Sequence, residues 1–170
     1  MAKGHFNVIK GAYPALAQID TSRKVADSVT GLVRGMTMRI DGSNEWVRTA
    51  DDTASKGAAG TPGPIIYFAL QDQDQTDVSM AGALTGLSCT QALEVETDQY
   101  NGTPAVGNML VGGLDGKVQV HASGETAIGV VTAAQYRRWI NDRDVGGVSK
   151  GAYGNVIRFM TVYIPDVDEA

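Results

Sequence analysis

The segment that decides the fold is NVIRFMTVYI, residues 155–164. Successive side chains of a strand point to opposite faces, and here both faces are apolar. One face carries Val156, Met160, Val162 and Ile164, and the other carries Ile157, Phe159 and Tyr163. A strand of this kind lies in the centre of a sandwich or in a subunit interface. The segment therefore predicts a mainly β protein.

Two earlier segments have the pattern of β-hairpins. RGMTMRIDGSNEWVRTA (34–50) and VGNMLVGGLDGKVQVHA (106–122) each contain an apolar strand, an Asp-Gly turn and a return strand. Each is followed, after a loop, by an apolar run typical of a buried strand, at 65–70 and 127–131. Two related β modules, one double-layered sandwich, or two generic hairpins would all explain the similarity.

The remaining segments predict an arm, a loop and a helix. Residues 1–30 carry apolar residues without a regular period, which indicates an extended N-terminal arm or an ordinary edge strand. Residues 50–64 are small and polar and predict a surface loop. Thr132 and Gln135 match a capping box, and Tyr136, Trp139 and Ile140 would share one face of a short helix.

The composition fits a β fold with many turns, because 21 of 170 residues are glycine and only 6% are aromatic. The net charge of −5 argues against nucleic acids and anionic membranes as partners. Residues 1–40 hold six basic and two acidic residues, a net charge of +4, which leaves −9 on the remainder. The N-terminal segment therefore favours an acidic partner surface.

Residues suited to catalysis or metal binding are few, and we expect no cofactor. Cys89 is a lone cysteine, and His121 alternates with polar residues as a solvated histidine does. Ser123 lies near His121, but no nucleophile-elbow motif is present, so we expect no enzyme activity. Asp72, Asp74 and Asp77 favour a solvated turn over a cation site, because the rest of a calcium loop is missing. Glu94, Glu96 and Asp98 are similarly expected to form the wet face of a strand.

The N-terminus lacks the apolar core of a secretion signal, and no apolar run is long enough to span a bilayer. We therefore expect no membrane association.

Several segments together resemble the capsid decoration, or cement, proteins of tailed phages. AYPAL (12–16) and DSVTGLVRGM (27–36), followed by GPIIYFALQDQDQTDV (63–78), carry the first part of the resemblance. The second part is the series AVGNMLV, DGKVQV and AIGVV, which looks like the small β-barrel modules of such proteins. The resemblance covers most of residues 12–131, and residues 133–154 have no counterpart.

The resemblance implies a virion protein that is made in the host cytoplasm and binds the outer surface of the capsid. Its partners would be the phage major capsid protein and copies of itself, often as a homotrimer. The predicted organisation is an arm (1–30), a first β module (31–98) and a second β module with the closing strand (99–170), or one compact domain. The predicted interface residues all lie in the arm: Phe6, Ile9, Tyr13, Leu16, Ile19, Arg23 and Lys24.

Two other classes of protein stay open at this stage. A β-sandwich receptor- or glycan-binding module of a phage fibre or adhesin would use exposed aromatic rings as stacking platforms. Its candidate residues are Trp46, Tyr100, Trp139 and Tyr153. An enzyme with a small site between subunits would use carboxylates, because histidine and cysteine are scarce.

Overall fold

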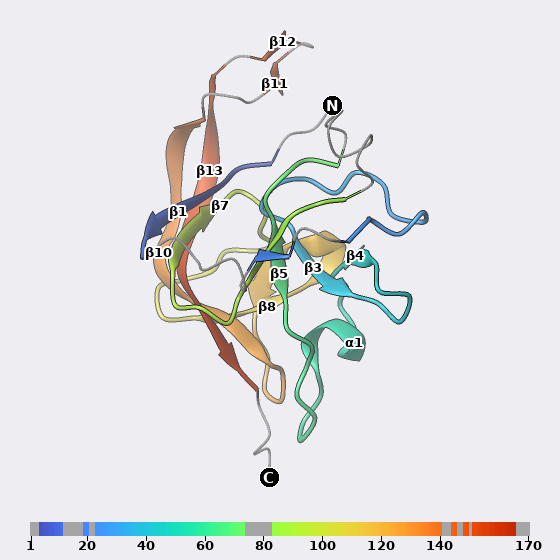
Figure 1. The fold of residues 1–170 in the computed structure, drawn as a ribbon. Coiled ribbons are helices and arrows are strands. Elements are labelled where there is room, and N and C mark those ends of the chain that lie inside the picture. Colours follow the sequence, from blue (N-terminus) through green and yellow to red (C-terminus); the bar gives the residue numbers. More distant parts are fainter. Residues whose placement is uncertain are drawn as a thin grey trace.

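The computed structural model describes residues 4–11, 19–20, 23–73, 83–140, 144–145, 148–149 and 151–165. In these residues the chain forms two open antiparallel sheets that pack face to face, with one short helix and one 3-10 turn (Figure 1). The prediction of a mainly β protein is confirmed. Neither sheet closes into a barrel, so the sandwich form of the prediction is the one the structure has.

The larger sheet has six strands and the smaller has five. In spatial order the larger sheet contains β1 (Phe6–Lys10), β7 (Glu94–Thr97), β13 (Ala152–Ile164), β10 (Ala127–Ile140), β8 (Met109–Gly112) and β9 (Val118–Val120). The smaller contains β2 (Ile19–Asp20), β6 (Gly86–Ser88), β5 (Tyr67–Ala69), β3 (Thr37–Ile40) and β4 (Trp46–Arg48). A separate short pair is formed by β11 (Asp144–Val145) and β12 (Val148–Ser149).

Both predicted hairpins are present. β3 pairs with β4 around a turn in which Asp41 Oδ1 accepts hydrogen bonds from the backbone N–H groups of Ser43 and Glu45, each at 2.9 Å. β8 pairs with β9 around the 3-10 turn Leu114–Gly116. Asp115 there has a φ of 57°, which an Asp tolerates better than most residues. Turn chemistry visible in the sequence therefore positions both hairpins.

The closing strand β13 is central, as its two apolar faces predict. It lies between β7 and β10 in the larger sheet. That sheet also includes β1 and β7, which come from residues 1–98. The larger sheet therefore combines strands from both predicted modules.

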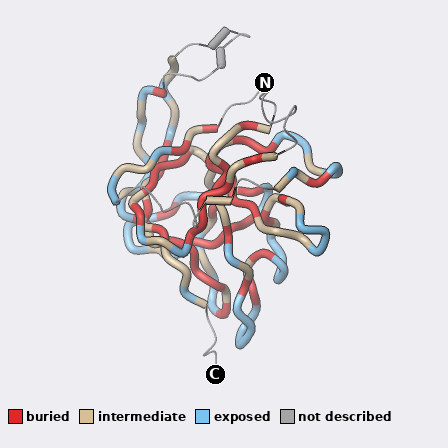
Figure 2. Tube along the Cα trace, in the orientation of Figure 1, coloured by how far each residue is buried: buried red, intermediate tan, exposed pale blue. Residues whose placement is uncertain are grey.

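The core lies where the two sheets face each other (Figure 2). Phe68 of β5 is fully buried between two rings of the opposite sheet, with centroids 5.4 Å from Phe6 and 5.7 Å from Phe159. Polar links join the sheets at the edges of this core. Thr49 Oγ1 donates to the carbonyl of Gly113 at 2.9 Å, and Tyr163 donates to the carbonyl of Gly63 at 2.6 Å.

Two local predictions need correction. The helix predicted from the capping box at Thr132 is wrong, because β10 continues as a strand through Ile140. Pairing with β13 gives hydrogen-bond partners to the backbone N–H and C=O groups of this segment. A helix here would be short and only marginally stable. The predicted loop 50–64 contains one helical turn, α1 (Thr53–Lys56), whose N-terminus is capped by the side chain of Asp52.

We predict that Phe68→Ala lowers the free energy of unfolding by about 3–5 kcal/mol, because it leaves a cavity between both sheets. Chemical denaturation followed by tryptophan fluorescence measures this loss. Ile65→Ala is the control, because Ile65 is 43% exposed and its truncation should cost far less. Equal losses in the two variants would contradict the assignment of Phe68 to the centre of the core.

Candidate functional site

The most distinctive feature is a two-stranded ribbon that leaves the body of the sandwich (Figure 1). β8 pairs with β10 only at Gly129 and Val130, and β7 pairs with β13 only from Ile157 to Met160. Beyond these points β10 and β13 pair only with each other within the described part of the chain. We call residues 135–140 and 151–155 the arm from here on; it is a different segment from the N-terminal arm predicted for residues 1–30.

One face of the arm is exposed. Trp139 pairs with Tyr153 across the ribbon and Arg137 pairs with Asn155, so the four side chains share a face. Trp139 is 51% exposed and Tyr153 is 62% exposed. Their rings meet edge to face at 5.2 Å, and the Arg137 guanidinium lies 4.9 Å from the centre of the Tyr153 ring. The arm therefore presents an ordered cluster of two aromatic rings and a cation.

Gly151 makes room for this cluster. A Cβ atom at Gly151 would overlap the six-membered ring of Trp139, so the indole lies directly against the glycine backbone. Only glycine at this position leaves room for the ring where it lies.

The opposite face of the arm is anchored to the body by the buried carboxylate of Glu96. His5 Nε2 lies 2.7 Å from one carboxylate oxygen, and Arg138 Nε lies 2.9 Å from the same oxygen. Tyr136 donates a hydrogen bond to the other oxygen, and Arg158 Nε lies 3.4 Å from it. Glu96 of β7 thus connects the segment before β1 with β10 and β13 at the base of the arm.

The electrostatics of this cluster favour the charged form of Glu96. Burial alone would raise the pKa of Glu96, but hydrogen bonds from Tyr136 and His5 and the charge of Arg138 outweigh it and lower the pKa. Burial, together with the bond to Glu96, raises the pKa of Tyr136 to about 12, so this tyrosine acts as a donor. The cluster is therefore a charge-assisted joint between the arm and the body.

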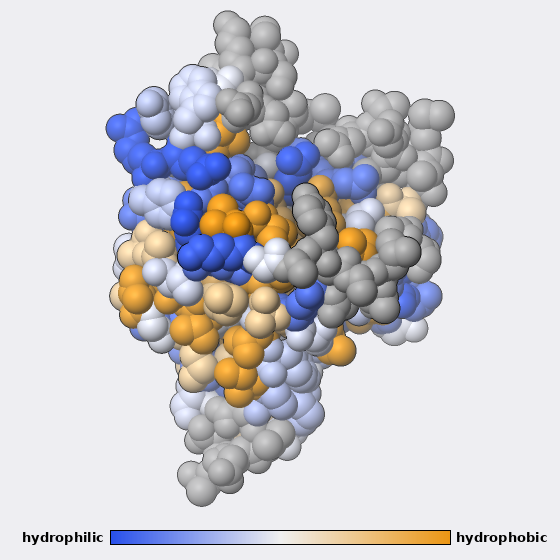
Figure 3. All heavy atoms as spheres, turned by 60° about the vertical axis from the view of Figure 1, so that its left-hand side comes forward, coloured by the Kyte–Doolittle hydropathy of each residue, from blue (hydrophilic) through white to orange (hydrophobic). Residues whose placement is uncertain are grey.

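The outer face of the larger sheet carries an uncovered apolar row. Met109, Val130 and Met160 are neighbours across β8, β10 and β13, and Glu94 and Lys10 continue the row on β7 and β1. Met109 is 38% exposed, and Val130 and Met160 are half-buried. Figure 3 shows hydrophobic side chains gathered on this side of the molecule, below the hydrophilic base of the arm.

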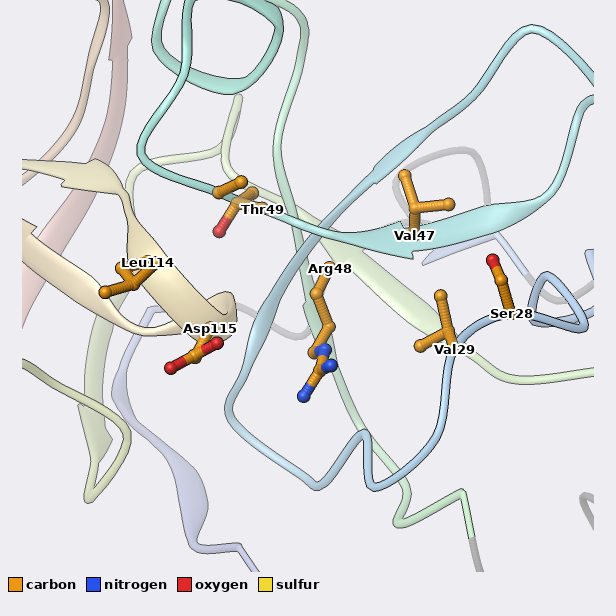
Figure 4. Close-up of a pocket in the computed structure, with 8 residues that line it drawn as sticks. Ser28, Val29, Val47, Arg48, Thr49, Leu114 and Asp115 are labelled. Carbon is orange, nitrogen blue, oxygen red and sulfur yellow. The ribbon is translucent and has the colours of Figure 1, made fainter.

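A shallow hollow of about 310 Å³ lies elsewhere, between β4 and the turn after β8 (Figure 4). Arg48 extends into it, and Val29, Val47, Leu114 and Asp115 form part of its wall. Its lining contains neither histidine nor cysteine. The hydroxyl residues Ser28 and Thr49 complete the polar part of its lining.

The residues considered from the sequence for catalysis or metal binding do not form a common site in the described part of the chain. Cys89 is fully buried, and burial raises the pKa of its thiol to about 11, so it is a core residue and not a nucleophile. Asp72 is buried and accepts hydrogen bonds from the backbone N–H groups of Gly4 and Arg34, whereas Asp74 and Asp77 lie outside the described residues. His121 is half-buried and Ser123 is exposed.

The described residues contain neither a cluster of metal-ligating side chains nor a helix that could span a membrane. No group of three or more His, Cys, Asp or Glu side chains is close enough together to hold a metal ion. Among the same residues, no helix has the length and apolarity needed to cross a membrane.

Those of the predicted interface residues in 1–24 that the structure describes do not lie together on a free N-terminal arm. Phe6 is a core residue and Ile9 lies on the edge strand β1, which supports the edge-strand alternative for this part. Ile19 lies on β2, which pairs with β6. Arg23 pairs with Asp20 at 2.8 Å and Lys24 with Glu45 at 2.7 Å. Tyr13 and Leu16 lie outside the described residues.

The sequence analysis missed the arm and misjudged Glu96. It expects Glu96 on the wet face of a strand, yet the side chain is fully buried under partners from β10, from β13 and from His5, which precedes β1. Those partners are distant in sequence, so no local pattern reveals them. The arm had a usable signal: the two-faced strand 155–164 needs a partner of similar length, and 127–140 supplies it.

Comparison with known proteins does not add an assignment. No protein-family model matches the chain, and neither the curated protein sequences nor the solved structures contain a significant match.

We predict that Glu96→Gln lowers the free energy of unfolding at neutral pH by about 3 kcal/mol, because the cations and donors around residue 96 lose a charged acceptor. A carboxylate with a lowered pKa stabilises the fold above the unfolded-state value of about 4.3, and the contribution is lost as pH falls through the folded-state pKa. The gap between wild type and variant should therefore shrink in acid.

Urea denaturation at a series of pH values measures this gap. Glu94→Gln is the matched control, because Glu94 lies on the same strand but is only half-buried. A gap that stays constant from neutral to strongly acidic pH would show that the Glu96 charge does not hold the joint together.

Proposed function

We propose that this chain is a non-enzymatic structural protein that docks on a larger assembly, and specifically that it decorates the outer surface of a tailed-phage capsid. The observation that supports docking best is the arm, which holds Arg137, Trp139 and Tyr153 exposed together away from the body. The resemblance in residues 12–131 to cement proteins supports the choice of a capsid.

The composition of the arm suits contact with a protein. Trp, Tyr and Arg are the residues most enriched among those that dominate binding energy at protein interfaces. Here the three side chains are already packed against one another, so little side-chain entropy is lost when a partner covers them. A pre-formed cluster of this kind therefore supports a role in docking on a protein partner.

Decoration would work by mass action. A protein that binds only the mature lattice shifts the capsid toward that state, and many symmetric sites multiply a modest contact energy. The proposed partners are the major capsid protein and further copies of this chain as a homotrimer, with no nucleic acid or membrane involved. The proposed location is the outer capsid surface of the virion.

A deletion of the N-terminal segment would not be a clean test of docking. Deleting residues 1–24 would remove β1, β2 and the core ring of Phe6, so loss of binding would follow from unfolding. Substitutions on the exposed face of the arm test docking without touching the core.

A glycan-binding module is the alternative, and Trp139 is its best candidate residue. Trp46 is excluded as a stacking platform, because it is fully buried and donates to the carbonyl of Leu84 at 2.7 Å. Tyr100 is half-buried and donates to Gln135 at 2.8 Å. Trp139 and Tyr153 lie at 77° to each other, and Arg137 occupies one side of Tyr153, so they form no common flat platform for a sugar. This geometry favours a protein partner.

We predict that the double variant Trp139→Ala/Tyr153→Ala loses at least tenfold in affinity for capsids that lack the protein, because two clustered aromatic anchors are removed. Co-sedimentation of the purified protein with these capsids measures the binding. Leu114→Ala is the control, because Leu114 is 52% exposed and lies outside the arm. The glycan-binding alternative would be favoured if wild-type protein did not bind these capsids but its tryptophan fluorescence changed when sugars were added.

A further inference from the structure

The free edge of β4 contains a residue whose backbone groups have no partner in the described part of the chain. Trp46 N–H donates to the carbonyl of Lys24 at 2.9 Å, and the Trp46 carbonyl accepts from Ala26 N–H at 3.0 Å, both on the edge away from β3. Alternate residues of a strand direct their N–H and C=O groups to the same edge. The backbone groups of Arg48 therefore face this edge too, and no described residue bonds to them there.

The hollow of Figure 4 lies along this edge, because the neighbouring segments turn away from it. Val29 N–H donates to the carbonyl of Ala26 at 2.9 Å and closes a turn, so pairing along the edge stops before Arg48. At the other end the carbonyl of Thr49 accepts a hydrogen bond from Gly116 N–H at 3.0 Å. The space left between the two turns, about 310 Å³, is at the small end of the range for ligand sites.

The side chain of Arg48 is unpaired as well. Its guanidinium forms no hydrogen bond or ion pair in the described part of the chain, although Arg48 is half-buried and extends into the hollow (Figure 4). The aliphatic stem packs against Gly116, where an added Cβ would lie 3.3 Å from Cγ of Arg48. Asp115 lines the same hollow and forms no ion pair with Arg48. A held guanidinium without an acceptor favours an anionic ligand.

An extended peptide with one acidic side chain satisfies both sets of groups. In an antiparallel pair, the residue directly opposite Arg48 can exchange two N–H···O=C bonds with it, and the two side chains lie on the same face. A glutamate at that position places its carboxylate beside the guanidinium. Its neighbours point to the other face, the side of Val47, so apolar flanking residues fit. Asp115 repels a second carboxylate, which favours a single acidic residue over an acidic run.

We infer that the edge of β4 binds an extended segment of a partner protein, with one glutamate opposite Arg48 and apolar residues on either side of it. The site shares no residue with the arm, so the inference does not depend on capsid binding. A protein that binds such a peptide but no capsid would retain it. Loss of peptide binding with intact capsid binding would overturn it without touching the proposed function.

The test titrates the isotope-labelled full chain with the blocked peptide acetyl-Val-Glu-Val-amide and follows backbone amide signals by NMR. Concentrations up to about 10 mM cover the millimolar dissociation constants expected of so small a contact. The Arg48 amide signal should shift and saturate, together with those of Val29 and Asp115. Acetyl-Val-Gln-Val-amide, which lacks the charge, and the glutamate peptide N-methylated at Glu, which lacks one N–H donor, should each bind at least about threefold more weakly.

Two variants of the protein complete the test. Arg48→Gln should bind the glutamate peptide at least about threefold more weakly, because it removes the guanidinium and keeps the backbone edge. Arg39→Gln is the matched control, because Arg39 is also half-buried but does not line the hollow, and it should bind as wild type does. Circular dichroism verifies that both variants are folded. Trp139→Ala/Tyr153→Ala should also keep peptide binding.

Three results would each overturn the inference. The first is an Arg48 amide signal that does not shift with the glutamate peptide. The second is equal affinity for the glutamate and glutamine peptides. The third is an equal shift with sodium acetate alone, because the hollow would then hold an adventitious anion only and no strand would be added.

Discussion

The pairing of β10 with β13 is the constraint on which the rest of the structure depends. At one end the two strands form the centre of the larger sheet, where Ile128, Val131 and Phe159 are buried in the core. At the other end the same hydrogen-bonded ladder leaves the body and carries Trp139 and Tyr153 into solvent. Because the same pair of strands runs through the core and the arm, the packing of the core also sets the direction of the arm. An isolated two-stranded ribbon is only marginally stable, so this continuity with the sheet is needed.

Glu96 makes that continuity rigid. Its carboxylate is buried, and burial of a charge is tolerated only where partners compensate for lost water. Here the partners are His5 from the segment preceding β1, Tyr136 and Arg138 from β10, and Arg158 from β13. The cost of desolvation is thereby offset by groups that lie on both strands of the ribbon. The arm is held at its base by electrostatics and along its length by backbone pairing.

The sequence predicts the fold class and several elements, but it does not reveal the site. The apolar faces of residues 155–164 and the turn chemistry at Asp41 and Asp115 are local signals, and the corresponding strand and hairpins are present. The segment from Thr132 has helical spacing, and long-range pairing overrode it. The burial of Glu96, Trp46 and Phe6 depends on partners distant in sequence, so the Glu96 joint could not be derived from residue spacing.

The most direct test of the arm as a protein-docking surface uses the two native tryptophans. Trp46 is fully buried and Trp139 is half exposed, so iodide should quench only the fluorescence of Trp139 in dilute protein. If the arm docks on a capsid, the quenchable fraction should fall when capsids that lack the protein are added, because Trp139 is then covered. The variant Trp139→Ala, which retains Trp46 alone, gives the background signal of Trp46 and of the capsid in the same mixture. A quenchable fraction that stays the same when such capsids are added would contradict the account, because Trp139 would then remain exposed.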